Sequence, residues 1–268
     1  MRMRRKPNLD LRIAKCAHLL AVPQNTRPYS RIDSQAYSKP GVQHDDQLGV
    51  PPDDQPDIQF GVPPDIQPGA MSDSLRGRWL EVFGYSELRL ELGCGKGRFT
   101  VESAKNEPDV LFAAFEKSAN VLVIALERAD SEGLKNVKFV GVFVDDLTRY
   151  FAPGELSRIY LNFPDPWPTN RYAKRRLTAK AYLEQYAEVL RPGGEIHLKT
   201  DNLPFFEFTL DSFRHSGYEL LEISSDIHKN GPVGVMTDYE LQFHSSGLPI
   251  YQCRARVSSI ATFDSPRN

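Results

Sequence analysis

The stretch LRLELGCGKGRFTVESA at residues 88–104 decides the fold class of this 268-residue chain. Residues 88–92 have the length and apolar content of a short strand, and a glycine-rich turn follows at 93–97. After the turn, Phe99, Val101 and Ala104 are placed to face the core from a helix. A strand, a glycine turn and a helix in this order predict the beginning of a parallel α/β sheet.

The same alternation continues to the C-terminus. The sequence predicts strands at 88–92, 110–115, 136–144, 158–163, 195–200, 218–224 and 250–257, with helices at 118–131, 178–190 and 204–215. Such alternation predicts an α/β fold with a mostly parallel seven-stranded sheet and helices on both faces. Ligands of such sheets bind outside the carboxyl ends of the strands, so the site is expected at that edge.

Two segments of opposite charge precede this domain. Residues 1–32 carry eight Lys and Arg against one Asp, and residues 33–74 carry one Lys against eight Asp. The second segment also holds seven prolines, only two aromatic residues and a near-repeat, GVPPDDQP at 49–56 and GVPPDIQP at 61–68. A segment of this composition buries too little apolar surface to fold. We therefore expect a basic N-terminal arm at 1–32, a disordered acidic insert at 33–74 and one domain at 75–268.

The overall composition excludes several classes of protein. A net charge of −2 with 40% hydrophobic and 25% charged residues is ordinary for a globular protein and rules out collagen-like and coiled-coil chains. The three cysteines, Cys16, Cys94 and Cys253, form no CxxC pair, which argues against a disulfide framework and a metal site. We find no apolar run of membrane-spanning length and no export signal. These features predict a cytoplasmic protein without a membrane partner or bound metal.

The glycine turn indicates the kind of cofactor. Its spacing is GxGxG, because Arg98 stands where a dinucleotide-binding GxGxxG loop would have its third glycine. This spacing suits a ligand without a pyrophosphate, such as S-adenosylmethionine, whose sulfonium and amino groups are cationic and favour a nearby carboxylate such as Glu91. Glu116 ends the second strand, where it can accept hydrogen bonds from both ribose hydroxyls. We expect Glu91, Gly93, Gly95 and Glu116 to bind the cofactor; a simple turn is the alternative.

A proline-rich loop follows the fourth strand. In NFPDPWP at 162–168, three prolines restrict the backbone around Asp165 and Trp167. The Asp165 carboxylate is suited to accept hydrogen bonds from the N1–H and N2–H₂ edge of guanine, which would orient N7 toward a methyl donor. Catalysis would then consist mainly of orientation and proximity. The alternative is a rigid turn with a capping Asp.

A basic strip lies directly after this loop. Five cations fall within ten residues: Arg171, Lys174, Arg175, Arg176 and Lys180. Beside a loop that holds a base, such cations are suited to the phosphates of a nucleic acid. The alternative is a solvated surface with no partner.

Several motifs together resemble a known family. They are ELGCGKGRF at 91–99, FEK at 115–117, LNFPDPWP at 161–168, AKRRL at 173–177, LRPGGEIHLKTDN at 190–202 and TDYE at 237–240. In this order and spacing the chain resembles the bacterial tRNA (guanine-N7)-methyltransferases of the TrmB type. The resemblance implies a Rossmann-like S-adenosylmethionine-dependent fold and a tRNA substrate, methylated at N7 of a guanosine in the variable loop.

The resemblance also implies roles for individual residues. Asp165 would be the catalytic carboxylate and would touch both cofactor and base, while Glu91 and Glu116 would bind the cofactor. The residues implied to contact the substrate are Asp201, Thr237, Asp238, Tyr239, Glu240, Arg171, Lys174, Arg175 and Arg176.

Two positions depart from the family pattern. Phe143 stands where the family usually has an adenine-contacting Asp, and Thr169 stands where it often has a Lys. Either a neighbour such as Asp145 takes over the adenine contact, or backbone and stacking hold the adenine. These departures motivate an alternative, a catalytically weak or silent RNA-binding protein on the same fold. A nicotinamide-dependent oxidoreductase is disfavoured by Arg98 and by the lack of a convincing catalytic set. The sequence allows a monomer or a homodimer.

Overall fold

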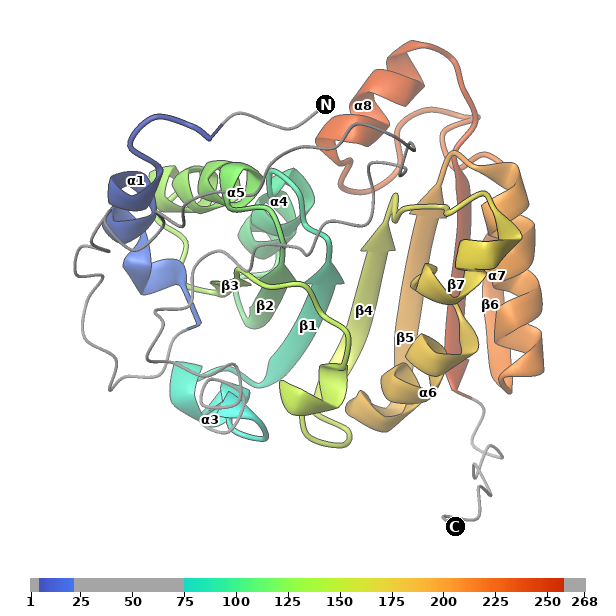
Figure 1. Cartoon of the computed structure of the whole chain (residues 1–268), viewed down its shortest axis with the longest axis horizontal. Coiled ribbons are helices and arrows are strands. Elements are labelled where there is room, and N and C mark those ends of the chain that lie inside the picture. The colour runs from blue at the N-terminus through green and yellow to red at the C-terminus, as the bar shows by residue number, and fades with distance from the viewer. Residues whose placement is uncertain (1–4, 22–74, 258–268) are drawn as a thin grey trace, which may run out of the picture.

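A seven-stranded sheet forms the centre of the computed structural model, which describes residues 5–21 and 75–257. The strand order is β3-β2-β1-β4-β5-β7-β6, and only β7 runs antiparallel to its neighbours. The strands are β1 (Glu87–Leu92), β2 (Val110–Phe115), β3 (Val137–Val140), β4 (Leu156–Asn162), β5 (Leu190–Thr200), β6 (Tyr218–Ser224) and β7 (Tyr251–Val257) (Figure 1). The predicted mostly parallel α/β sheet is confirmed.

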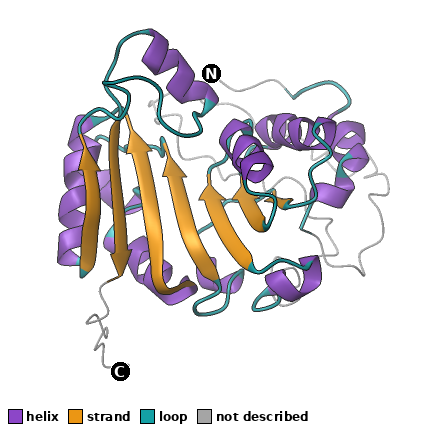
Figure 2. Ribbon diagram, turned by 180° about the vertical axis from the view of Figure 1, so that it is seen from behind, coloured by secondary structure: helices purple, strands orange, loops and turns teal. Residues whose placement is uncertain are grey.

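Helices cover both faces of this sheet. The α-helices are α1 (Leu9–Lys15), α3 (Trp79–Phe83), α4 (Arg98–Asn106), α5 (Ala119–Ser131), α6 (Lys180–Val189), α7 (Leu203–His215) and α8 (Asp238–Ser245), and the 3₁₀ helices are η1 (Ala17–Leu19), η2 (Leu147–Arg149) and η3 (Asn170–Arg175). Helices α1, α4 and α5 lie on one face, and α6 and α7 lie on the other (Figure 2). Strand β2 is therefore buried on both sides, with Leu111 and Phe115 in one apolar cluster and Phe112 and Ala114 in the other.

Two predicted strand boundaries and one helix differ in the structure. Strand β3 ends at Val140, four residues before the predicted end, because its partner β2 ends at the paired Phe115. Residues 141–144 therefore leave the sheet as a loop at its edge. Strand β5 begins at Leu190, so the predicted turn at 192–194 lies within the strand, beside a register shift in the pairing with β4. Helix α8 was not predicted, because its weakly patterned residues show no clear amphipathic stripe.

The described part of the N-terminal arm packs on the domain. Leu9 and Ile13 of α1 are buried in the cluster that also contains α5, and Arg12 donates to both carboxylate oxygens of Glu127 at 2.6 Å. Leu20 forms an isolated bridge to β3. Residues 5–21 are thus part of the folded unit. The predicted disordered insert at 33–74 lies outside the described residues.

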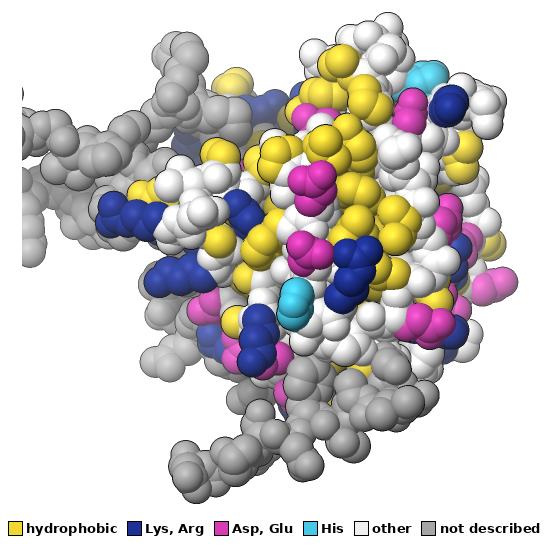
Figure 3. All heavy atoms as spheres, turned by 90° about the vertical axis from the view of Figure 1, so that its right-hand side faces the viewer, with side chains coloured by type: hydrophobic (Ala, Val, Ile, Leu, Met, Phe, Trp, Pro, Cys, Tyr) yellow, Lys and Arg dark blue, Asp and Glu magenta, His cyan; other side chains and the backbone are white. Residues whose placement is uncertain are grey.

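The edge strand β6 carries a mixed surface. Hydrophobic side chains lie among acidic and basic ones on the side of the molecule that β6 and α7 form (Figure 3). Ile223 of β6 is 51% exposed. Glu219 and Glu222 of β6 pair with arginines of β7. Charged side chains on an edge strand discourage pairing with another sheet.

Three other features concern residues 5–21 and 75–257 only. Within these ranges no helix has both the length and the apolar character needed to cross a membrane. Among the same residues, no group of three His, Cys, Asp or Glu side chains is arranged to hold a metal ion. The three cysteines are buried and unpaired.

The glycine turn lets α4 begin directly against α5. Gly97 precedes α4 with a φ of 76°, in the left-handed region. A Cβ atom at this position would lie 2.6 Å from the Cβ of Ala125 on α5, which is closer than real side chains approach. A side chain at Gly97 would therefore force the two helices apart as well as strain the backbone.

We expect Gly97→Ala to lower the free energy of unfolding by roughly 2–4 kcal/mol, since overpacking and the left-handed backbone both contribute. Urea titration measures this loss. Gly84→Ala is the matched control, because Gly84 has a φ of 75° but a Cβ there would meet nothing within 4 Å. An equal loss in both variants would show that the contact with Ala125 contributes nothing.

Candidate functional site

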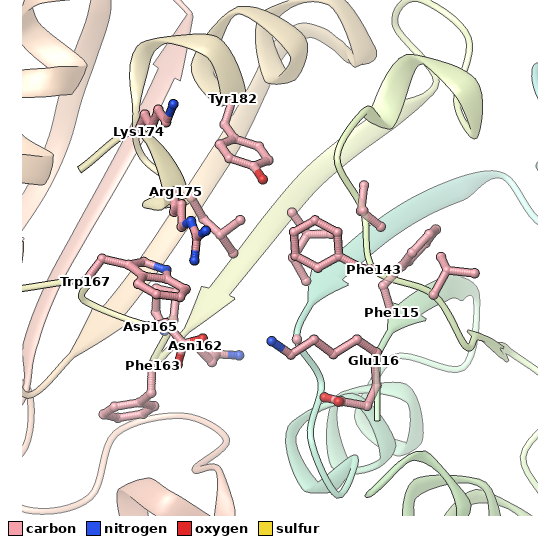
Figure 4. A pocket seen from close by; sticks show the side chains of 17 residues that line it. Phe115, Glu116, Phe143, Asn162, Phe163, Asp165, Trp167, Lys174, Arg175 and Tyr182 are labelled. Carbon is pink, nitrogen blue, oxygen red and sulfur yellow. The ribbon is translucent and has the colours of Figure 1, made fainter. Parts of the chain in front are cut away.

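A pocket of about 1000 Å³ opens at the carboxyl ends of β1, β2, β3 and β4. Residues that follow β4 and residues that follow β2 and β3 face each other across it (Figure 4). Its lining includes Gly93, Glu116, Lys117, Phe143, Asn162, Phe163, Asp165, Trp167, Lys174, Arg175 and Tyr182. The glycine turn and the proline-rich loop meet here because β1 and β4 are neighbours in the sheet.

Glu116 has a fixed orientation at the wall of the pocket. Its Oε2 accepts a hydrogen bond from the backbone N–H of Gly95 at 3.1 Å, and its Oε1 accepts one from Ser118 at 2.8 Å. Gly93 lines the same wall with a φ of 76°, and a Cβ there would project into open space. A carboxylate with a fixed orientation can accept hydrogen bonds from the hydroxyl groups of a nucleoside, and a backbone without a side chain lets the nucleoside approach closely.

Glu91 lies behind the pocket. It is 1% exposed and accepts hydrogen bonds from the Thr100 hydroxyl and from Nδ2 of Asn162, the latter at 2.9 Å. Burial raises the pKa of this carboxyl group. Asn162 lines the pocket itself, so Glu91 reaches the site through Asn162. Sequence reasoning assigned Asn162 no role, although its place at the carboxyl end of a strand was an available signal.

The proline-rich loop presents Asp165 between two unusual backbone conformations. Phe163 has a φ of 53° and Trp167 a φ of 42°, both in the left-handed region that residues other than glycine rarely adopt. Such residues cost roughly 1–3 kcal/mol each and persist where the surroundings hold them. At one end the Phe163 N–H donates to the Lys199 carbonyl at 2.8 Å. The exposed Asp165 carboxylate is thereby held over the pocket that also contains Glu116.

Helix η3 carries most of the basic strip. Arg171, Lys174 and Arg175 are exposed, and Lys174 and Arg175 line the pocket. The Arg175 guanidinium lies 5.0 Å from the ring centroids of both Trp167 and Tyr172, so cations and aromatic rings alternate at the mouth. This arrangement fits a nucleic-acid backbone with an unstacked base.

Arg176 differs from the rest of the strip. It is 7% exposed, and its guanidinium donates to the backbone carbonyls of Pro166 and Trp167. Its burial argues against the direct RNA contact predicted for it, because a side chain enclosed by protein cannot reach a phosphate without leaving its place.

The TDYE residues hold helix α8 against the edge of the sheet. Thr237 caps the helix by accepting from the N–H of Glu240, and Asp238 pairs with Arg128 of α5 at 3.0 Å. Tyr239 is 43% exposed, packs on Phe163 with 4.9 Å between ring centroids, and lies 3.4 Å from the carboxylate of Asp201. Tyr239 is thus the member of this motif most open to a substrate.

Glu240 is fully buried. Its carboxylate accepts hydrogen bonds from Lys199 Nζ at 2.8 Å, from His228 at 2.7 Å and from the Thr237 N–H at 3.1 Å. These contacts join α8 to β5, and they argue against the predicted substrate contact by Glu240. His228 is not near Glu240 in the sequence, so no local signal reveals this partnership.

Phe143 occupies the side of the pocket beyond Glu116. Its ring is 53% exposed, and Lys117 Nζ lies 5.9 Å from the ring centroid. With Val142 and Val144 it forms an apolar wall of the pocket. The flat aromatic ring of a ligand could pack on this wall.

Comparisons with known proteins show the family to which the chain belongs. A model of the family described as "Putative methyltransferase" matches residues 86–253. The chain is 48% identical over 185 residues to the tRNA (guanine-N(7)-)-methyltransferase of Geobacillus kaustophilus (strain HTA426), covering 68% of this chain and 85% of that protein. It is 43% identical over 186 residues to the protein of that name from Streptococcus suis (strain 05ZYH33), covering 69% and 88%. This chain belongs to the tRNA (guanine-N7)-methyltransferase family.

Solved structures support the fold of this family member. It resembles the 16S rRNA methyltransferase KamB with a TM-score of 0.50 and 16% identity, over 70% of this chain and 93% of that chain. The aminoglycoside resistance methyltransferase NpmB1 gives a TM-score of 0.50 and 19% identity, over 68% of this chain and 93% of that chain. At such identities the likeness concerns only the fold. The resemblance inferred from the motifs and the Rossmann-like methyltransferase fold are confirmed.

Proposed function

We propose that this protein methylates N7 of a guanosine in the variable loop of tRNA, with S-adenosylmethionine as the donor. The observation that carries the proposal is the placement of Asp165 and Glu116 in one pocket, with exposed cations at its mouth. The names of the curated relatives agree with the reaction. A tRNA substrate is consistent with a cytoplasmic enzyme.

Glu116, Gly93 and Asn162 would hold the cofactor. The two carboxylate oxygens of Glu116 are already oriented by backbone N–H groups, so they can accept from vicinal ribose hydroxyls without rearrangement. Phe143 would pack against the adenine in place of a carboxylate contact. When bound, the cofactor supplies an electrophilic methyl group on a sulfonium.

Asp165 would hold the base. Its carboxylate can accept hydrogen bonds from the N1–H and N2–H₂ groups of guanine, which points the opposite N7 edge into the pocket. N7 carries a lone pair and no proton, so this chain has to orient the base without removing a proton. Methylation leaves the purine positively charged, and the negative Asp165 also stabilises that developing charge.

The basic strip would capture the RNA. Arg171, Lys174 and Arg175 lie on one short helix beside the pocket, where they can contact the phosphates that flank the target base. Trp167 offers an aromatic ring at the same place. We assign recognition of the strand to these residues and leave orientation of the base to Asp165.

Transfer of tritiated methyl groups from S-adenosylmethionine to unmodified tRNA tests the proposal. We expect label in the tRNA and cleavage at a single variable-loop position after aniline treatment, which detects 7-methylguanosine. The same tRNA with that guanosine replaced by adenosine is the control and should accept no label. Binding of tRNA without any transfer would instead favour the silent RNA-binding protein.

We expect Glu116→Gln to weaken binding of S-adenosylhomocysteine by roughly 10- to 100-fold, because a charged acceptor is replaced by a neutral group whose NH₂ opposes the donors around it. Isothermal titration calorimetry measures the change. Glu132→Gln serves as control, since Glu132 is an exposed carboxylate that pairs with Lys105 and does not line the pocket. Unchanged affinity in the Glu116 variant would refute its role.

A further inference from the structure

We propose that Arg176 is a positioning residue for methyl transfer, because it fixes the end of the loop that places Asp165 over the pocket. The effect on catalysis rests on the proposed function. The contact itself does not depend on the substrate: a buried guanidinium holds the backbone on the C-terminal side of Asp165.

The loop has few means of holding itself in place. Pro164, Pro166 and Pro168 have no backbone N–H, so they cannot donate hydrogen bonds within the loop. On the N-terminal side of Asp165, the N–H of Phe163 is bound to the Lys199 carbonyl on β5. On the C-terminal side, Trp167 has a left-handed φ of 42°, a conformation that requires support from its surroundings.

Arg176 supplies that support. Its Nε donates to the carbonyl of Pro166 at 3.0 Å, and its Nη2 donates to the carbonyl of Trp167 at 3.0 Å. The guanidinium carbon lies 4.2 Å from the ring centroid of Phe208 on α7. The side chain, which is 7% exposed, therefore connects the loop to helix α7, which packs on the sheet.

These contacts require the shape of an arginine. A planar guanidinium can donate to two neighbouring carbonyls and stack on an aromatic ring at the same time. A lysine ammonium is a compact charge that cannot reproduce this flat, two-point contact. We therefore expect Arg176→Lys to be defective although charge is conserved.

The adjacent arginine provides a matched control. Arg175 is exposed and contacts the rings of Trp167 and Tyr172, whereas Arg176 holds the backbone of Trp167 from inside. Removal of either residue deletes one positive charge from the same strip. If both acted only through charge, the two variants would behave alike.

The Arg176 variants and Arg175→Ala are expected to change different kinetic parameters. We expect Arg176→Ala and Arg176→Lys to lower kcat at saturating tRNA by roughly 30- to 100-fold, since displacement of a reacting group by about 1 Å has effects of this order. The dissociation constants of tRNA and S-adenosylhomocysteine should stay within about threefold. Arg175→Ala should act mainly by raising KM for tRNA.

Chemical rescue and hydrogen exchange complete the test. Methylguanidine should restore part of the kcat of Arg176→Ala, because it can occupy the space of the missing guanidinium, and should not restore Arg175→Ala. Without any substrate, peptides covering 163–170 should exchange backbone hydrogens faster in Arg176→Ala and Arg176→Lys than in Arg175→Ala. The exchange measurement does not depend on methyl transfer. If the wild-type protein had no activity, the proposed function would be overturned, and hydrogen exchange would still test whether Arg176 holds the loop.

Three results would overturn the inference. One is a wild-type kcat in a folded Arg176→Lys protein. Another is a loss of tRNA affinity in Arg176→Ala that equals the loss in Arg175→Ala, which would indicate direct RNA contact by Arg176. The third is unchanged exchange of 163–170 in both Arg176 variants. Arg176→Lys retains the charge and most of the bulk, so it covers the case in which the alanine variant fails to fold.

Discussion

Asp165→Asn is expected to lower kcat/KM for methyl transfer to tRNA by about 10³-fold, because orientation of the base and stabilisation of its developing charge are lost together. The asparagine NH₂ would face the N–H donors of the guanine edge, and the negative charge beside the methylated purine would be absent. Initial rates with limiting and saturating tRNA measure the loss and divide it between kcat and KM.

The fold should survive this substitution. Asp165 is exposed and lies in a loop whose backbone is held by other residues, so its replacement opens no cavity in the core. We expect a melting temperature within a few degrees of the wild-type value. Asp109→Asn is the control, since Asp109 is an exposed carboxylate just before β2 that does not line the pocket. Full activity of Asp165→Asn would remove Asp165 from the reaction.

Replacing Arg171, Lys174 and Arg175 together by alanine should weaken tRNA binding by about 100-fold at low salt. Each phosphate contact releases counterions, so the slope of log affinity against log salt should become less steep by roughly 2 to 3. Filter binding between low and moderate salt measures both quantities. The effect should fall on RNA capture, with S-adenosylhomocysteine affinity unchanged.

A triple variant elsewhere on the surface controls for net charge. Arg78, Lys105 and Arg214 are accessible cations near the ends of α3, α4 and α7, and each is paired with a carboxylate. Their replacement by alanine removes the same charge without touching the pocket. If the salt slope changed equally in both triple variants, the strip beside the pocket would have no special part in binding.

The features that could be predicted from the sequence depend on local chemistry. Alternating strands and helices, the glycine turn at 93–97 and the prolines around Asp165 each act through periodicity or backbone restriction within a few residues. Since parallel strands place their carboxyl ends at one edge, the meeting of the glycine turn and the proline-rich loop also followed from the order of elements. The end of β3 could not be predicted in this way, because it depends on where the neighbouring strand β2 ends.

The direction in which each polar side chain points depends instead on distant parts of the chain. Arg175 and Arg176 are identical in type and adjacent in sequence, yet one is exposed and the other is covered by Phe208. Glu240 is enclosed by His228 and Lys199, and Glu91 reaches the pocket only through Asn162. Motifs could therefore mark the residues that matter. Burial separated the side chains that are exposed at the pocket from those that hold its walls, because burial is produced by packing between elements far apart in sequence.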